Sequence, residues 1–278
     1  MNFGPYLLAR SLFSSTMALT RSSIRLVRTT SSDALSIFEQ LCIEEALLRS
    51  DSRNWCILNR GANPPVIVMG ISGKPEMLVQ LDAVKNARVP VIRRFSGGGT
   101  VVVDSGTVFA SFVCSRDAVP EKPSFPRELM EWSAKFYEPV FSRLCGNTSP
   151  FSLRENDYCL GDTKVGGNAQ TLSAGRWVHH TSFLWSFREE HMRLLTLPSK
   201  RPAYRLDRPH SAFLTPLCEH HPFGGSLDDS EGAEALHDAI EGRLHEAFDV
   251  VETATLAEVR NILAGTTQRQ TNEVVQLK

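Results

Sequence analysis

RRFSGGGTVVVD, residues 93–104, is the most informative run of this 278-residue sequence. Three consecutive glycines stand between segments rich in β-branched residues, so the run predicts a turn between two strands. Glycine amides can approach an anion without interference from a Cβ atom, and Arg93 and Arg94 add charge and paired donors. The run lacks the Lys-Ser/Thr end of a P-loop and the spacing of a dinucleotide fingerprint. It therefore predicts either another kind of phosphate-binding loop or a hairpin turn with two exposed arginines.

Further strands and helices are predicted on both sides of this run. Short apolar segments bounded by turn-forming residues predict strands at residues 55–58, 65–71, 89–94, 100–103, 108–113, 158–160, 164–170 and 176–187. Amphipathic spacing predicts helices at residues 127–144, 231–248, 256–263 and 33–49, the last with Ser32 as its N-cap. Strands in the middle and helices at the ends favour an α+β domain with a mixed central β-sheet flanked by helices.

The chain divides into three predicted parts. Residues 1–32 hold four arginines, many Ser and Thr and no acidic residue, which is typical of a disordered organelle-targeting leader. Residues 33–215 are long enough for one catalytic domain, and residues 216–278 form a short, helical C-terminal segment. The leader predicts import into the mitochondrial matrix. The alternatives are a chloroplast address, an ordinary disordered tail, or a cytosolic protein if translation starts at Met17.

Composition argues against several classes of function. Without the four arginines of the leader, 26 basic residues face 31 acidic residues, a formal net charge of −5 that disfavours general nucleic-acid binding. No apolar run in the sequence is long enough to span a membrane. The six cysteines are scattered without a CxxC pair, which favours reduced thiols over disulfides or a zinc site.

RENDYCLGDTKVGGNAQ, residues 154–170, carries a candidate catalytic lysine. Lys164 begins a predicted strand next to a glycine pair where a ligand can come close, and its ammonium could stabilise negative charge on a phosphoryl group. Asp157, together with Asn156, is a candidate for holding Mg²⁺, which takes one or two carboxylates plus phosphate oxygens. The alternative is that Asp157 is a turn residue and Lys164 a solvated strand end.

His179 and His180 are adjacent in a predicted strand. Neighbours on a strand point to opposite faces, so at most one of them reaches a given site. We expect His179 to be structural and His180 to be the candidate donor that orients a ligand. A looser group of possible zinc ligands consists of Cys218, His220 and His221. It lacks the further pair of ligands that would complete a zinc site.

In order and spacing, these runs resemble the lipoate–protein ligase A family of the biotin and lipoate ligase superfamily, in its eukaryotic organellar form. The resemblance covers about residues 33–213. Residues 93–104 are similar to the family's RRxSGGGxVxxDxG loop, which wraps the acyl-adenylate, and Lys164 falls on its active-site lysine. The resemblance implies a class II synthetase-like fold. Two mild departures are HHTSFLW in place of HHGTLL and GGNA in place of SGSA.

The resemblance also implies the other site residues. Binding of the adenylate or its phosphate is implied for Arg93, Arg94, Ser96, Gly97, Gly98, Gly99 and Thr100. Acyl binding is implied for Gly70, Gly166, Gly167, Asn168, Ala169, His180 and Thr181. Asn156 and Asp157 align with the family's ND pair, and Asp157 remains the candidate Mg²⁺ ligand.

The implied activity is that of a ligase that forms a lipoyl- or octanoyl-adenylate from ATP with Mg²⁺ and transfers the acyl group to a lysine. The implied partners are the small-molecule acid and lipoyl-acceptor domains of 2-oxoacid dehydrogenase complexes or the glycine cleavage H protein. Nucleic acid and membrane are not expected as partners, and a monomer is expected. The roughly 60 residues after Phe213 are few for an accessory domain, which leaves open a need for a partner or transfer from a preformed acyl-adenylate.

Two rival interpretations remain open. A transferase that works through a thioester would need a cysteine beside Lys164, and Cys159 is the candidate. The other rival is a catalytically silent homologue that binds the acceptor, against which the intact Lys164 and glycine triplet argue. The basic segment 198–208 predicts either a contact with an acidic acceptor domain or a solvated loop.

Overall fold

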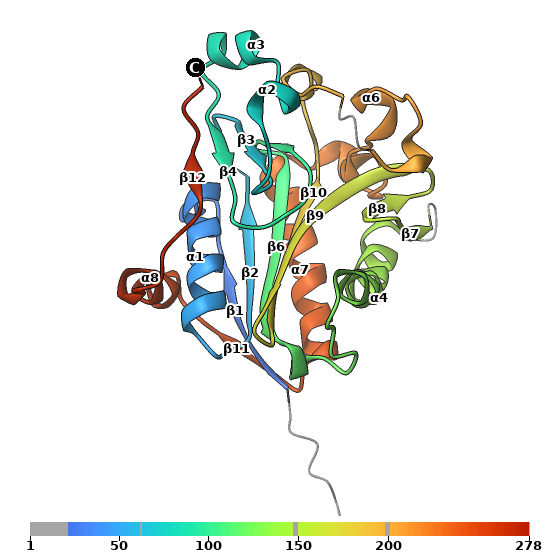
Figure 1. Ribbon diagram of the computed structural model, residues 1–278. Coiled ribbons are helices and arrows are strands. Elements are labelled where there is room, and N and C mark those ends of the chain that lie inside the picture. The colour runs from blue at the N-terminus through green and yellow to red at the C-terminus, as the bar shows by residue number, and fades with distance from the viewer. Residues whose placement is uncertain (1–21, 62, 147–149, 198–200, 278) are drawn as a thin grey trace, which may run out of the picture.

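Two β-sheets form the centre of the computed structural model, which describes residues 22–61, 63–146, 150–197 and 201–277 (Figure 1). In the larger sheet the strand order is β11-β1-β2-β6-β10-β9-β8-β7, and in the smaller sheet it is β12-β4-β3-β5. The strands of the larger sheet are β1 (Ser23–Arg28), β2 (Trp55–Arg60), β6 (Thr107–Ser115), β7 (Phe151–Arg154), β8 (Asp157–Leu160), β9 (Thr163–Ser173), β10 (Arg176–Leu184) and β11 (Val250–Thr253). Those of the smaller sheet are β3 (Val66–Met69), β4 (Val91–Arg93), β5 (Val101–Val103) and β12 (Glu273–Val274).

Both sheets are mixed. In the larger one β1 pairs parallel with β2 and β11, whereas the pairs from β2–β6 to β8–β7 are antiparallel. In the smaller one β3 is parallel to β4 and antiparallel to β5. The predicted α+β fold with a mixed central sheet is confirmed, and each predicted strand is present with shifted ends. Strands β1, β7, β11 and β12 were not predicted.

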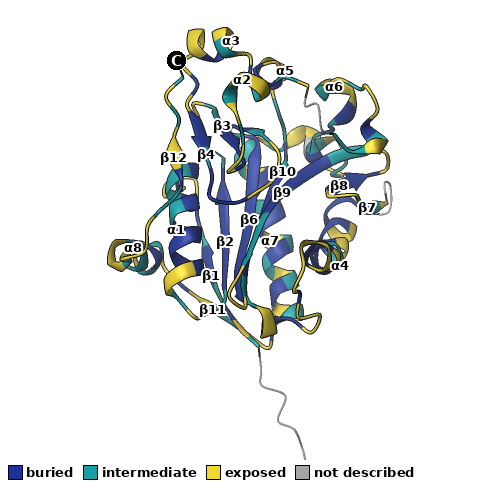
Figure 2. Cartoon of the chain, in the orientation of Figure 1, coloured by how far each residue is buried: buried dark blue, intermediate teal, exposed yellow. Residues whose placement is uncertain are grey.

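Helices cover both faces of the larger sheet (Figures 1 and 2). The longer ones are α1 (Ile37–Ser50), α4 (Pro126–Cys145), α7 (Asp229–Ala247) and α8 (Leu256–Gly265), and the shorter ones are α2 (Pro75–Leu78), α3 (Leu81–Asn86), α5 (Glu189–Met192) and α6 (His210–Phe213). Helices α4 and α7 lie on one face, and α1 with α8 on the other. None of the described helices is both long and apolar enough to cross a membrane.

Strand β6 shows how the sequence supplies both layers. Its side chains alternate, so Val108 and Phe112 enter the core beneath α4 and α7, while Phe109 and Val113 face the opposite side. Phe112 makes an edge contact with Trp132 of α4, with ring centroids 5.2 Å apart. Burial of both faces explains why β6 reads as a nearly continuous apolar run rather than as an alternating pattern.

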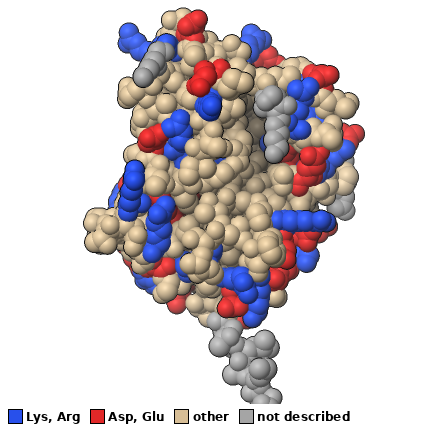
Figure 3. All heavy atoms as spheres, in the orientation of Figure 1, with Lys and Arg blue, Asp and Glu red and all other residues tan. Residues whose placement is uncertain are grey.

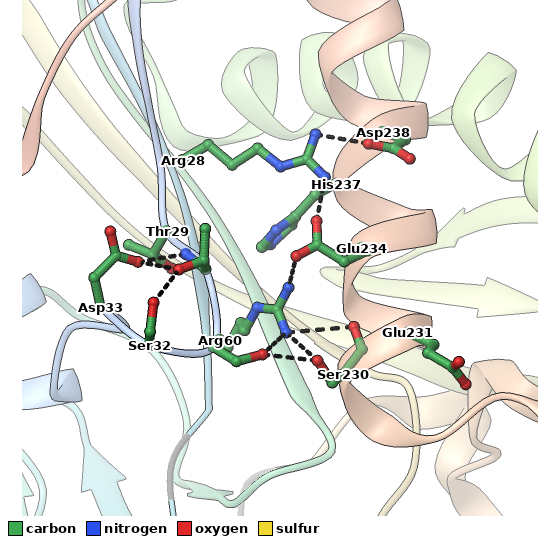
Figure 4. Close-up of polar contacts among 12 residues, drawn as sticks. Arg28, Thr29, Ser32, Asp33, Arg60, Ser230, Glu231, Glu234, His237 and Asp238 are labelled. Atoms are coloured by element: carbon green, nitrogen blue, oxygen red, sulfur yellow. Dashed lines mark hydrogen bonds and ion pairs between the residues drawn. The ribbon is translucent and has the colours of Figure 1, made fainter.

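The predicted boundary of the leader at residue 32 is wrong. Residues 23–28 form β1, an inner strand of the larger sheet between β11 and β2. Arg28 of β1 and Arg60 of β2 both form ion pairs with Glu234 of α7, and Arg28 also pairs with Asp238 (Figure 4). The arginines that suggested a leader thus include two strand residues, because composition does not distinguish a cationic strand end from a targeting signal. Residues 1–21 lie outside the described part of the chain.

Two further predictions about the chain ends need correction. The segment 216–278 is not simply helical, since β11 joins the larger sheet and β12 pairs with β4 of the smaller one. Helix α1 begins at Ile37 rather than at Asp33, and its N-cap is Ser36, whose side chain accepts a hydrogen bond from Glu39 N. Asp33 instead accepts bonds from Thr30 in the preceding turn.

Candidate functional site

A cavity of about 950 Å³ lies between the smaller sheet, strands β9 and β10, and the segment 201–213. The face drawn in Figure 3 is hollowed in this region. We call residues 201–213 the cover segment, because side chains along it line the cavity. Part of the lining comes from one hydrophobic cluster, which we call the apolar arm of the cavity: Ile37, Val68, Val101, Val103 and Phe109. The lining also includes the glycine triplet and several cations.

The glycine run forms a loop whose shape depends on close backbone packing. Gly98 has a φ of 116°, which favours glycine, and a Cβ there would lie 3.2 Å from Asn168 O of β9. Gly70 lies behind the loop, where a Cβ would come within 2.5 Å of Gly98 O. All three glycines of the triplet and Thr100 line the cavity.

The two arginines of the run have different surroundings. Arg94 is buried and lines the cavity, and its Nη2 donates to Gly97 O and Gly99 O, both at 2.9 Å. Burial lowers the pKa of Arg94 to about 10. Arg93 points elsewhere, forming an ion pair with Glu273 of β12 and donating to Gly73 O at 3.2 Å. The sequence predicted two phosphate donors, but the structure gives one arginine that braces the loop and one that anchors the C-terminal strand.

Ser96 is buried beside the loop rather than placed in the cavity lining. Its carbonyl accepts a hydrogen bond from Ile71 N at 3.0 Å, which ties the loop to the segment after β3. Its predicted contact with phosphate therefore has no geometric support.

Lys164 enters the cavity because of an irregularity in β9. Tyr158 pairs with Gly166 but Cys159 pairs with Lys164, so one extra residue, Val165, is accommodated on β9. This bulge places Val165 in the core and Lys164 on the cavity side. A Cβ at Gly167 would lie 3.2 Å from Lys164 Nζ. Lys164 thus lies close to Gly167, and Gly98 lies close to the next residue of the same strand, Asn168. The lysine and the glycine triplet therefore line one cavity.

The Lys164 ammonium is held by Asp157 of β8. Its Nζ lies 2.6 Å from Asp157 Oδ1, while Asp157 Oδ2 accepts a bond from Tyr204 OH of the cover segment at 2.9 Å. The Tyr204 hydroxyl also lies 3.3 Å from Cys159 Sγ. Burial and the adjacent Asp157 raise the pKa of Tyr204, so the phenol stays protonated as a donor.

These contacts test the predicted metal site. Both oxygens of Asp157 already have partners, and within the described ranges no group of three or more His, Cys, Asp or Glu side chains could hold a metal ion. The residues present do not fit a protein-built Mg²⁺ site. The assignment of Mg²⁺ to Asp157 therefore stays a prediction without geometric support.

His180 lines the cavity beside the apolar arm, and its ring centroid lies 5.1 Å from that of Phe109. His180 Nδ1 is 2.8 Å from Glu44 Oε1 of α1 and 3.0 Å from Ser111 Oγ. Burial alone would raise the pKa of Glu44, but His180 and the donors Ser111 and Gln40 outweigh it and lower that pKa. The network fixes the orientation of the imidazole ring, so His180 is positioned at the inner end of the cavity.

The predicted acyl-binding residues of β9 and β10 fall into two groups. Gly167, Asn168, Ala169 and His180 line the cavity. Gly166 faces the core, where a Cβ would meet the Phe183 ring at 2.6 Å. Thr181 is buried under α4 and accepts a bond from Tyr137 OH at 3.1 Å. Gly166 and Thr181 therefore do not reach the cavity.

His179 is structural, as expected. It is fully buried, and its Nε2 lies 2.7 Å from Tyr158 OH on the face away from the cavity. Burial and the neighbouring His180 lower the pKa of His179 to about 3, so this ring is neutral.

Sequence reasoning missed four residues of this site: Glu44, Tyr204, Arg205 and His210. Glu44 falls on the buried stripe of α1, where a carboxylate at an apolar position was the available signal. The other three belong to the cover segment. Tyr204 and Arg205 fell in the basic segment 198–208, which was interpreted either as a contact with an acceptor or as a solvated loop, and His210 lay outside it. Their inward orientation is set by contacts with β8 and β9 that no local pattern encodes.

Comparison with known proteins identifies the family. The model of a family described as the lipoyl protein ligase A/B catalytic domain matches residues 36–220. A Plasmodium falciparum protein named inactive lipoate–protein ligase 2 is 28% identical over 240 residues, which cover 66% of this chain and 62% of that protein. The chain thus spans less than two thirds of the length of this relative.

Solved structures share the fold. A lipoate-protein ligase A bound with ATP superposes with a TM-score of 0.64 at 18% identity, covering 88% of this chain and 92% of the other. A Thermoplasma acidophilum structure, described as a bipartite lipoate protein ligase and its E2 lipoyl domain, has a TM-score of 0.62 at 20% identity and covers 88% and 90%. At these identities the likeness establishes the class II synthetase-like fold alone.

Proposed function

Because the chain belongs to the lipoyl protein ligase A/B catalytic domain family, we propose that it activates lipoate or octanoate with ATP and transfers the acyl group to a lysine of an acceptor domain. One observation carries the proposal: a single cavity is lined both by the apolar arm and by Lys164 and the glycine triplet, with Lys164 close to Gly167 of β9 and Gly98 close to the next residue, Asn168. The apolar arm suits an acyl chain, and the cationic end suits the phosphate of an adenylate.

The proposed chemistry has two steps. The carboxylate of the acid attacks the α-phosphate of ATP and pyrophosphate leaves, giving the acyl-adenylate. The amine of the acceptor lysine then attacks the acyl carbonyl and AMP leaves. In both steps negative charge builds near the Lys164 ammonium and the amides of the glycine loop, which are held in place beforehand by Asp157 and Arg94. Preorganised donors of this kind stabilise a transition state without reorganisation.

An acceptor domain of the lipoyl type is the proposed protein partner. The T. acidophilum structure, described as a ligase with its E2 lipoyl domain, supports this choice through the shared fold. Acceptor domains of 2-oxoacid dehydrogenase complexes and the glycine cleavage H protein are the proposed candidates.

A thioester route through Cys159 is disfavoured by the geometry. Its sulfur is buried, does not line the cavity, and lies 3.3 Å from Tyr204 OH. Burial raises the pKa of the Cys159 thiol, so the nucleophilic thiolate is scarce.

Transfer without activation is the second candidate function, and the relative named inactive favours keeping it. Such a protein would accept a preformed acyl-adenylate, or would bind the acceptor without chemistry. Pyrophosphate release distinguishes these cases, since only the first step of the full ligase reaction produces it.

The deciding experiment incubates the protein with ATP, Mg²⁺ and lipoate or octanoate, and measures pyrophosphate. A mass spectrum of an added lipoyl domain then shows whether the acyl group was transferred. Lys164→Met should lower the rate by about 10²- to 10³-fold, as loss of a transition-state donor does. The exposed Lys135→Met is the matched control and should be unchanged. No pyrophosphate but transfer from synthetic lipoyl-adenylate would establish the second candidate, and neither activity would leave a binding protein.

A further inference from the structure

Arg205 of the cover segment is a buried cation with an unused donor. Its side chain is 5% exposed and lines the cavity, and Nη2 has no hydrogen-bond partner among the described residues. The guanidinium Nε donates a hydrogen bond to Arg208 O at 3.2 Å. Leaving a charged donor buried without a partner is costly, so such groups call for an explanation.

The guanidinium is held firmly where it lies. It sits over the Phe213 ring, 4.5 Å from the centroid. Arg208 stacks on the same ring at 5.3 Å and donates to the carbonyls of Tyr204, Arg205 and Asp162. These bonds stiffen the backbone on either side of Arg205. The inward orientation of its side chain is therefore set by the surrounding structure rather than by chance.

Arg205 shares a side chamber of about 80 Å³ with Lys164. This is several times the space that a single water molecule needs. Thr100 also lines the chamber, and its Oγ1 is buried without a partner in the described residues. The nearest acid, Asp157, has both oxygens bonded to Lys164 and Tyr204. Two cations and an unpartnered hydroxyl therefore line a chamber that has no carboxylate among its described lining residues.

We propose that Arg205 is a ligand of the phosphate group of the bound nucleotide, acting opposite Lys164 across this chamber. The proposal rests on the proposed function and assigns a role that the two arginines of the glycine run do not fill, because Arg93 points away and Arg94 is engaged with loop carbonyls. Burial lowers the pKa of Arg205, and a phosphate would restore the charge balance that burial disturbs.

Calorimetric titration with AMP and with adenosine tests this role, since the two ligands differ by the phosphate. In the unmodified protein AMP should bind more tightly than adenosine. Arg205→Ala should weaken AMP by about 10- to 100-fold, the usual loss for a charged hydrogen bond, and leave adenosine within about twofold. Arg205→Lys should recover part of the AMP affinity, because it keeps the charge but loses the planar fork.

Arg208→Ala is the matched control on the same segment, since Arg208 braces the backbone and lines neither chamber. It should change AMP and adenosine to the same degree. If Arg205→Ala also weakens both ligands equally, or leaves the preference for AMP intact, Arg205 is a structural residue and the proposal fails. If the unmodified protein binds neither AMP nor adenosine, the proposed nucleotide site itself is wrong. That result is distinct from the failure of the Arg205 proposal alone.

Discussion

At the scale of single residues, the site is defined by what its charged groups already bind. Asp157 sets the position of Lys164, and Tyr204 occupies the second oxygen of that carboxylate. Arg94 is engaged with carbonyls of its own loop. Only the neighbours of each cation show whether it is free to meet a ligand.

Tyr204→Phe should lower the rate of acyl transfer by about tenfold, because a hydrogen bond to a carboxylate is worth about 1.5–3 kcal/mol and here it orients the partner of Lys164. The KM for the acid should change little, since the apolar arm is untouched. Steady-state kinetics with octanoate check this split. Tyr137→Phe is the control, because its hydroxyl contacts Thr181 on the opposite face. Equal losses in both variants would speak against a positioning role.

At the scale of elements, the bulge in β9 is the decisive feature. An unbroken strand would place Lys164 and Gly166 on the same face, under α4. The inserted Val165 turns the lysine to the cavity side, so that it meets Gly167 rather than sharing the face of Gly166. A tight contact to the Phe183 ring requires glycine at 166, and the approach of the lysine requires it at 167.

Gly166→Ala and Gly167→Ala should therefore change different properties of the protein. The first places a methyl group against the Phe183 ring and should cost about 1–3 kcal/mol of unfolding free energy by overpacking. The second meets only the flexible end of Lys164, so stability should hold while the rate of acyl transfer falls. Urea unfolding and the transfer assay measure the two effects. A Gly167→Ala variant that is destabilised but fully active would refute the assigned faces.

At the scale of the whole molecule, the two ends of the chain complete the sheets. Strand β1 lies between β2 and β11, and a partly buried polar cluster joins β1 and β2 to α7 (Figure 4). His237 lies within this cluster, with Nε2 3.3 Å from Asn59 O. The cavity is thus built on a frame that forms only when residues over 200 positions apart meet.

His237 should make the fold sensitive to acid. Burial, with Arg28 and Arg60, lowers its pKa to about 4, while an unfolded histidine takes up its proton near pH 6.5. The stability it contributes is therefore complete above about pH 6.5 and is lost as the pH falls towards 4, by up to about 3 kcal/mol. His237→Gln should flatten this slope in urea unfolding at several pH values, whereas the exposed His245→Gln should not.

The proposed mitochondrial targeting leader should end before β1. A chain that begins at Ser22 should keep the melting temperature and activity of the full protein, because residues 23–28 supply an inner strand. A chain that begins at Asp33 should lose both and aggregate, since the removal of β1 exposes the edges of β2 and β11. Sequencing the mature N-terminus after import locates the cut. A stable protein that starts at Asp33 would contradict the role of β1.

Most of the fold and part of the site followed from local sequence signals. Periodicity predicted the central strands, and the glycine triplet with Lys164 marked the anion-binding end because few backbones need three consecutive glycines. Local patterns cannot report which partner a side chain meets, so the roles of Arg93, Gly166 and Thr181 were misjudged and Arg205 was missed. The tertiary structure decided these, because sheet pairing, a one-residue bulge and the packing of the cover segment determine which face and which charge each residue meets.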